Sequence, residues 1–156
     1  MHKKCVSSVF GIIILLFTVS PAVYSQSNRV IDRVLEQEQA TFARALYLVQ
    51  TASGTAEEDL DPRTLAAEFD AAEWHIPAAA AAEEPITLGE YAQLLMHAFD
   101  IRSGIMYRLF PGPRYAAREI EHLGFPRSSG APGRTVTGDE VVDILRQVLE
   151  WKGEQS

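Results

Sequence analysis

Apolar residues recur at steps of three and four along most of the chain, the spacing that places side chains on one face of a helix. Five segments carry such a stripe, and no stretch shows the alternation expected of a half-buried strand. We therefore predict an all-α, mainly helical domain of about five helices, with at most short strand pairs in its loops. The predicted inward positions are Val30, Ile31, Val34, Phe42, Ala45, Leu46 and Val49; Leu65, Phe69 and Ala72; Tyr91, Leu94, Leu95, Ala98 and Phe99; Ala116, Ile120 and Leu123; and Val141, Ile144, Leu145, Val148 and Leu149.

Local signals place the ends of these helices. The first helix lies within 28–54. Asp61 is a suitable N-cap for the second, DPRTLAAEFDAAEW, with Pro62 at its first helical position. Gly124 stops the fourth helix. The glycines and prolines of the linker 102–112 interrupt the helical pattern before that helix begins.

A ten-residue phrase, ITLGEYAQLL, returns 50 residues later as VTGDEVVDIL. Both copies have the form Thr-x-x-Glu ahead of an apolar stripe, which predicts a capping box at Thr87 and Glu90 and another at Thr137 and Glu140. In such a box the threonine oxygen accepts from the third helical N–H and the glutamate accepts from the threonine's own N–H. Loss of the threonine should cost about 1 kcal/mol. This structural role by itself is sufficient for all four residues.

The repetition extends beyond the caps. Two units of a proline-started helix, a proline-containing loop, a capping box and a second helix occupy 61–101 and 113–152. The extra N-terminal helix, 28–54, is similar to the second helix of a unit, with Phe42 placed opposite Tyr91. Two full units and a lone helix would have to share one core, as stacked repeats do.

The N-terminus predicts export. Two lysines precede a short apolar run, and the small residues Val23 and Ser25 suit a cut before Gln26. We expect a signal peptide over 1–25 and a single domain over 26–156. The alternative is an uncleaved anchor, and only in that case do we expect the chain to contact a membrane.

The one cysteine, Cys5, lies within the expected signal peptide, so the mature chain would hold no disulfide and no thiol chemistry. Export without disulfides suits a bacterial envelope protein better than a small eukaryotic secreted scaffold. We therefore expect the periplasm or the cell surface of a bacterium.

Charge is distributed unevenly along the chain. The whole sequence has 14 Lys+Arg and 21 Asp+Glu, and removing two lysines with 1–25 gives a mature charge of −9 (12 − 21). Over 101–138 six arginines face two glutamates, a local charge of +4. An acidic chain is a poor general nucleic-acid binder, whereas an arginine cluster can hold an anion. The alternative is that these arginines are solvated in loops or paired with the acidic remainder.

The segment RYAAREIEHLGF followed by GRTVTGDEVVDIL resembles the S-layer homology (SLH) repeat. The shared features are the Tyr-Ala pair in the first helix, the glycine near its end and the capping box before the second helix. The resemblance is weaker over 61–101 and weakest over 28–54. It implies a helical fold and attachment to an anionic cell-wall polysaccharide. In that family the arginine of a Thr-Arg-Ala-Glu box helps to hold the polymer, whereas the boxes here are TLGE and TGDE. The cap is kept and the arginine is not.

Other cations would then have to contact a wall polymer. Arginines in or beside the loops are candidates because a planar guanidinium meets carboxylate or phosphate in a bidentate way. Tyr115 or Trp74 could offer a flat face to a sugar, or could simply pack at the edge of the core. The candidate ligand-binding residues are Arg102, Arg114, Tyr115, Arg127 and Arg134.

Catalytic motifs are not found: the sequence contains no Gly-x-Ser-x-Gly, no His-Glu-x-x-His and no Walker loop. Glu119 and His122 share a helix face, as do His97 and Asp100, but neither pair has the companion residues of a carboxylate di-metal site. We expect no enzymatic activity, no cofactor and no metal.

Two functions from different classes follow. The first is a non-catalytic envelope module that attaches to cell-wall polymer, a polysaccharide linked to peptidoglycan. The second is a periplasmic scaffold or adaptor that binds another envelope protein through its helical faces. A small metal-binding protein based on Glu119 and His122 is the third hypothesis.

Overall fold

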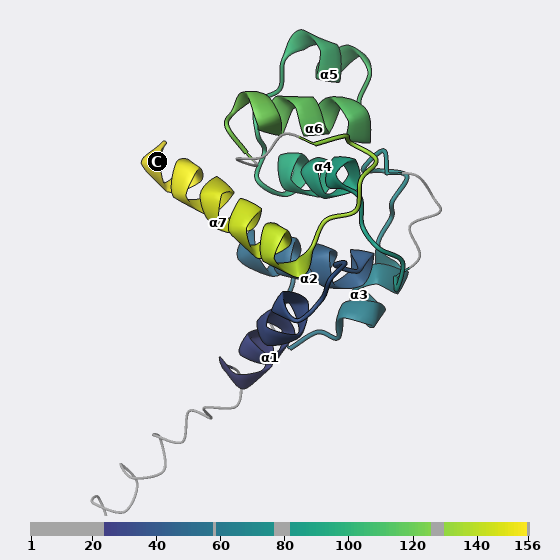
Figure 1. Cartoon of the computed structure of the whole chain (residues 1–156), viewed down its shortest axis with the longest axis vertical. Coiled ribbons are helices and arrows are strands. Elements are labelled where there is room, and N and C mark those ends of the chain that lie inside the picture. Colours follow the sequence, from purple (N-terminus) through teal and green to yellow (C-terminus); the bar gives the residue numbers. More distant parts are fainter. Residues whose placement is uncertain (1–23, 58, 77–81, 126–129, 156) are drawn as a thin grey trace, which may run out of the picture.

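The computed structural model describes residues 24–57, 59–76, 82–125 and 130–155 (Figure 1). These residues form seven helices and no strand beyond two isolated β-bridges, so the all-α prediction is confirmed and the expected number of helices, about five, was too low. The helices are α1 (Tyr24–Leu35), α2 (Phe42–Ala52), α3 (Pro62–Glu68), α4 (Leu88–Ala98), α5 (Ile105–Leu109), α6 (Pro113–His122) and α7 (Gly138–Glu154). The expected signal peptide lies outside the described residues except for its last two positions.

Three extended segments meet at the centre of the molecule, each just ahead of a helix. The N–H of Ala40 donates to Val136 O (2.9 Å), that of Val136 to Ile86 O (3.1 Å), and that of Ile86 to Ala40 O (2.9 Å). These bonds close a ring of three residues, all of them fully buried. We call this the central ring.

The central ring gives the fold an approximate threefold plan. Its residues precede α2, α4 and α7, and each of these helices packs on the first helix of the next unit: α2 on α3, α4 on α6, and α7 on α1. The first N–H of each helix also donates to the neighbouring unit: Phe42 to Glu84 O, Leu88 to Arg134 O and Gly138 to Gln37 O, at 2.8–3.1 Å. The chain therefore contains three units, α1–α2, α3–α4 and α6–α7.

The N-terminal segment 28–54, predicted as a lone helix, is two helices. The chain leaves the helical conformation at Thr41, whose φ and ψ of −84° and 152° are extended. Ala40 has both backbone groups engaged in the central ring and so cannot join a helix ladder. The alignment of Phe42 with Tyr91 was also wrong, because Phe42 and Leu88 both occupy the position directly after the threonine.

The second helix is shorter than expected. Phe69, predicted on its inner face, is its extended C-cap, and Ala72 is exposed. Asp70 provides the cause: its Oδ1 accepts from the N–H groups of Ala72 (3.0 Å) and Glu73 (3.2 Å), a local turn that competes with the helix. The linker 102–112 also differs from the prediction, because it contains α5.

Both predicted capping boxes are present. Thr87 N–H donates to Glu90 Oε2 at 2.8 Å and Glu90 N–H to Thr87 Oγ1 at 3.3 Å. The matching distances at Thr137 and Glu140 are both 3.2 Å. Each box fixes the direction in which its helix leaves the central ring.

A single core lies between the three units. Most of the predicted inward positions are buried, with Val30, Ile31, Ala98 and Leu123 half-buried and Leu149 exposed. The fully buried Tyr91 donates its hydroxyl to Val141 O at 2.7 Å and joins α4 to α7. Burial raises the pKa of this phenol far above its usual range, so its proton stays available for that bond. In the part of the chain that the structure describes, no helix has the length and apolar character needed to cross a membrane.

The close contact of α7 with α1 predicts a position-specific effect of adding one methyl group. A Cβ at Gly138 would overlap the carbonyl of Val34, a backbone group that cannot rotate away. We expect Gly138→Ala to lower the free energy of unfolding by about 2 kcal/mol or more, measured by urea titration.

Gly153, in the same helix, is the matched control, since nothing lies within 4 Å of an added Cβ. Gly153→Ala should leave stability unchanged or raise it by up to about 1 kcal/mol. Equal stability of the two variants would contradict the tight packing of α7 against α1.

Candidate functional site

The N-terminus of α2 departs from the pattern of the other two units. Thr41 occupies the place of Thr87 and Thr137, but its side chain makes no capping bond, and its Oγ1 is buried without a described hydrogen-bond partner. The third helical position, glutamate in both boxes, is Arg44. A cation is disfavoured in the first turn of a helix. This position has therefore given up its capping role.

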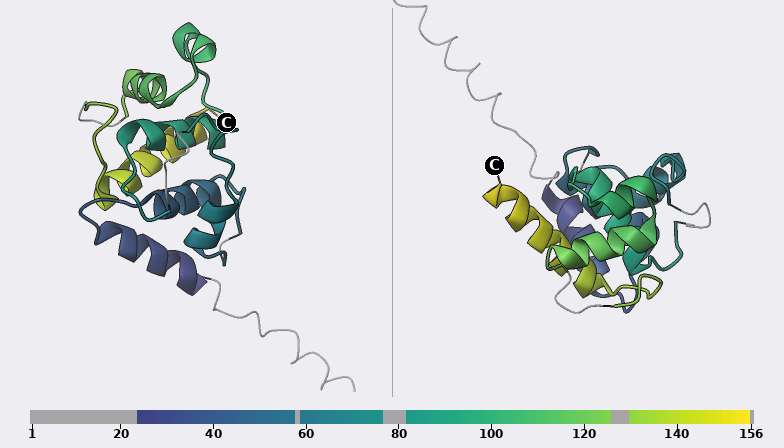
Figure 2. Two further views of the ribbon diagram at one scale, coloured as in Figure 1. Left: turned by 90° about the vertical axis from the view of Figure 1, so that its right-hand side faces the viewer. Right: turned by 90° about the horizontal axis from the view of Figure 1, so that it is seen from above.

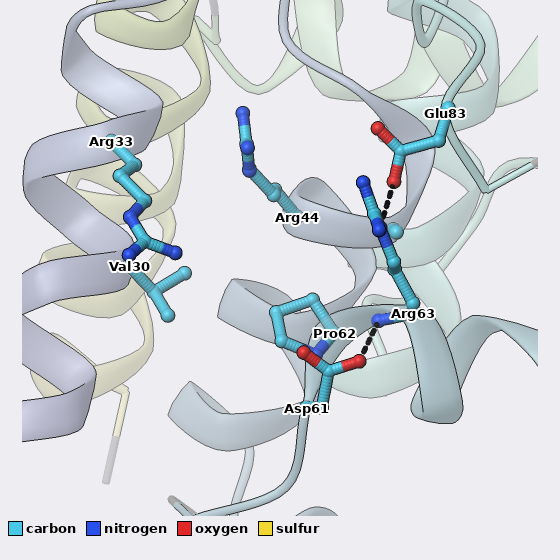
Figure 3. A pocket seen from close by; sticks show the side chains of 8 residues that line it. Val30, Arg33, Arg44, Asp61, Pro62, Arg63 and Glu83 are labelled. Atoms are coloured by element: carbon cyan, nitrogen blue, oxygen red, sulfur yellow. Dashed lines mark hydrogen bonds and ion pairs between the residues drawn. The ribbon is translucent and has the colours of Figure 1, made fainter.

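Arg44 lines a hollow of about 250 Å³ together with residues from three elements (Figure 3). Arg33 comes from α1 on one side, Arg63 from α3 on the other, and Arg44 from α2 between them. The remaining lining residues are Val30, Ala43, Asp61, Pro62 and Glu83. We call this the arginine pocket.

The two carboxylates of the arginine pocket are already engaged. Asp61 caps α3, with its Oδ2 accepting from Arg63 N–H (3.1 Å) and Thr64 N–H (3.2 Å). Glu83 Oε1 accepts from Arg63 Nε at 2.6 Å, and this hydrogen bond is the main cause that raises the pKa of Arg63. The two side chains remain 72% and 56% exposed, so water screens the pair and its contribution to stability is small.

Arg33 and Arg44 have no ion-pair partner among the described residues. A second hollow of about 250 Å³ adjoins the first and adds Arg29, one turn before Arg33 on α1. Four arginines therefore line two neighbouring hollows. Since arginine stays charged at any ordinary pH, this chemistry is suited to holding an anion and not to proton transfer.

The residues predicted from the sequence are not gathered in this pocket. Arg134 forms a two-pronged pair with Glu140 (2.9 and 2.8 Å), which raises the pKa of the arginine and lowers that of the glutamate. Arg102 and Arg114 are exposed. Tyr115 is half-buried with its ring stacked on Phe110, and Arg127 lies outside the described residues. The ion pair of Arg134 with Glu140 therefore supports the second capping box.

Trp74 packs in an aromatic cluster rather than presenting an open face. Its ring stacks on His97 with centroids 5.1 Å apart and meets Phe69 edge-on. The Gln93 amide nitrogen donates to Trp74 O (2.9 Å) and lies 3.1 Å from His97 Nε2. An amide nitrogen only donates, so His97 Nε2 is the acceptor in this contact.

The pair Glu119 and His122, considered for metal binding, lines a hollow beside α5. Glu119 Oε2 accepts from the N–H of Gly104 at 3.0 Å, which holds the start of α5 on α6. The described residues contain no group of three metal-binding side chains.

The arginine pocket was missed because its residues are separated in the sequence and the first unit was not recognised as a repeat. Aligning Thr41 with Thr87 and Thr137 would have shown Arg44 in place of a capping glutamate, the one local signal of a different role. The convergence of Arg33 and Arg63 on it depends on the packing of α1 and α3 around α2, which no short motif records. Comparison of the chain with protein-family models, curated proteins and solved structures finds no match.

The aromatic cluster predicts a pH dependence. Burial, and next the charge of His75, lowers the pKa of His97 below its usual value of about 6.5. The unfolded chain then binds this proton more readily than the folded chain, so His97 lowers the free energy of unfolding as pH falls through about 6.5. We expect urea titrations at pH 7.5 and 5.5 to show a smaller decrease for His97→Gln than for the unmodified chain.

His122→Gln is the control for that comparison, because His122, on α6, takes no part in the aromatic cluster around His97. It should keep the pH dependence of the unmodified chain. The explanation fails if His97→Gln and the unmodified chain lose the same stability between the two pH values.

Proposed function

We propose that this chain is an exported, non-catalytic, SLH-like envelope module that holds anionic groups of a cell-wall polymer in the arginine pocket. The observation that carries the proposal is the convergence of Arg33, Arg44 and Arg63 on one hollow, with two of the three lacking a described ion-pair partner. The polymer contact expected at Arg102, Arg114, Tyr115, Arg127 and Arg134 is the competing location.

The electrostatics of the pocket favour a multivalent anion. Arginines that line one hollow carry like charges, and a bound carboxylate or phosphate would offset their repulsion while forming charge-assisted hydrogen bonds. Glu83 partly screens Arg63, but through an exposed pair that a stronger anion can displace. The ligand class is therefore a phosphate- or carboxylate-bearing polysaccharide.

The loss of the cap supports a binding role for Arg44. In the other two units the same position is a glutamate whose carboxylate completes a capping box. An arginine there cannot make that bond and opposes the helix dipole, and Thr41 Oγ1 has no described hydrogen-bond partner. The first two N–H groups of α2 donate to Glu84 O and Ala82 O. A residue that breaks a local structural rule in this way marks a functional position more often than a structural one.

Co-sedimentation with isolated cell-wall sacculi tests the proposal. The chain beginning at Gln26 should pellet with intact sacculi in a salt-sensitive manner and stay in solution with sacculi stripped of their anionic polymer. Replacing Arg33 and Arg44 with glutamine should weaken binding at least about ten-fold, since two charge-assisted contacts are lost.

The matched control removes the same charge elsewhere. Arg102 and Arg114 are exposed arginines of the competing site, and their double replacement by glutamine should leave pelleting unchanged. If the control double variant loses binding while the pocket variant keeps it, the polymer contact lies where the sequence alone placed it. No pelleting of the unmodified chain would reject the wall-polymer function.

The second candidate, an adaptor for another envelope protein, is favoured by a separate observation. The short helix α5 leaves large apolar side chains exposed, and such a surface is a common mark of an interaction site. This surface and the arginine pocket lie at opposite ends of the long axis of the molecule (Figures 1 and 2), so one function does not depend on the other.

A further inference from the structure

The helix α5 presents its apolar side chains to solvent. Ile105 is 74% exposed, Met106 54%, Leu109 64% and Phe110, its C-cap, 60%. They are four of only six large apolar residues exposed in the described chain, and all four fall within residues 105–110. Core packing accounts for none of them.

The opposite side of α5 is firmly attached. Tyr107 is buried against the core, the N–H of Gly104 donates to Glu119, and the Phe110 ring stacks on Tyr115 with centroids 6.3 Å apart. The helix stands at one end of the molecule, over α6 (Figures 1 and 2). The exposed side chains therefore sit on a fixed projection.

Four exposed arginines lie on α5 or close to it along the chain. Arg108 lies on α5, Arg102 precedes it, and Arg114 and Arg118 lie on α6 directly after it, all four exposed. Arg118 lines the same hollow of about 420 Å³ as Ile105 and Met106. Glu119 lines it too, with its carboxylate accepting from the N–H of Gly104. No described carboxylate lies within ion-pair distance of any of the four. In a chain whose formal charge is −7, this surface is apolar at its centre and positive at its rim.

We propose that α5 and this arginine rim dock on the surface of an anionic phospholipid bilayer. Leu109, Phe110 and their two apolar neighbours enter the boundary between headgroups and acyl chains, about 5–10 Å deep, while the arginines meet lipid phosphates. The arrangement of a small apolar wedge with basic neighbours is that of interfacial helices, which gain affinity from buried apolar area and from attraction to anionic lipid.

Two other occupants, a second copy and the protein partner of the second candidate function, fit this surface less well. A second copy docked face to face would bring the four arginines against their own counterparts, and a head-to-tail contact would produce an open chain of copies. A partner protein generally covers about 800 Å² on each side, whereas α5 is a projection of five helical residues with arginines around it. Docking on a bilayer, unlike docking on a protein, does not require a partner surface of complementary shape.

A fluorescent label on α5 tests the proposal in the full chain. Cys5→Ser removes the only cysteine, and Met106→Cys then accepts one environment-sensitive dye. We expect the emission at position 106 to shift to the blue with vesicles of phosphatidylglycerol and phosphatidylcholine, and to stay unchanged with phosphatidylcholine alone. High salt should reduce the shift. Leu109→Glu in the labelled chain should weaken vesicle binding about ten-fold or more.

A label at Leu35→Cys is the matched control, because Leu35 is an exposed leucine that ends α1, outside α5 and its arginines. A shift at position 35 and not at 106 would assign membrane contact to the surface around the end of α1 and overturn the proposal. So would equal shifts with both lipid compositions, or a shift at 106 that rises with protein concentration in the absence of lipid, which would identify a second copy. No shift at 106 with anionic vesicles would also overturn it and leave a protein partner for α5.

Discussion

Three backbone hydrogen bonds at the centre of the molecule hold its three units together. Ala40, Ile86 and Val136 each donate to one partner and accept from the other, so six buried backbone groups are satisfied in one closed ring. An unpaired buried amide or carbonyl would cost about 1–3 kcal/mol, and removing any one unit would leave a donor and an acceptor unpaired. The three units therefore share one core and are not separate domains.

The ring also fixes where each second helix begins. The residue after each ring member is a threonine, and the helix that follows it starts with an N–H bond to the next unit. In α4 and α7 a capping box also directs the helix, whereas Thr41 makes no capping bond at α2. Gly138 shows how tight this geometry is, since α7 starts so close to the Val34 carbonyl that no side chain fits. Local capping and tertiary packing thus favour the same first residue for both α4 and α7. Such agreement between local and tertiary interactions is expected of a sequence with one well-defined fold.

Much of this architecture could be predicted from the sequence, and the failures have physical causes. Periodicity and capping boxes placed α4, α6 and α7 correctly, because their signals lie within one turn of the helix that they define. The break between α1 and α2 was missed because its cause is a tertiary hydrogen bond at Ala40, and the shortening of α3 because the Asp70 side chain competes with the helix. Arg134, predicted as a ligand-binding residue, instead forms an ion pair with Glu140. The two residues are six positions apart, and their approach depends on the conformation of the loop between them.

The two candidate interaction surfaces both occur where the threefold plan is broken. In the first unit, Arg44 replaces the capping glutamate and faces a hollow between α1 and α3. Between α4 and α6 the chain has 14 residues (99–112), against nine (53–61) at the equivalent junction of α2 and α3, and the longer connection contains α5. Symmetry of the core requires neither feature, and each costs something locally: a lost cap in one case, exposed apolar surface in the other. Stability alone would have favoured a capping glutamate in the first unit and a short connection without exposed apolar residues. Positions that depart from the repeat at a cost in stability are therefore the strongest candidates for a functional role.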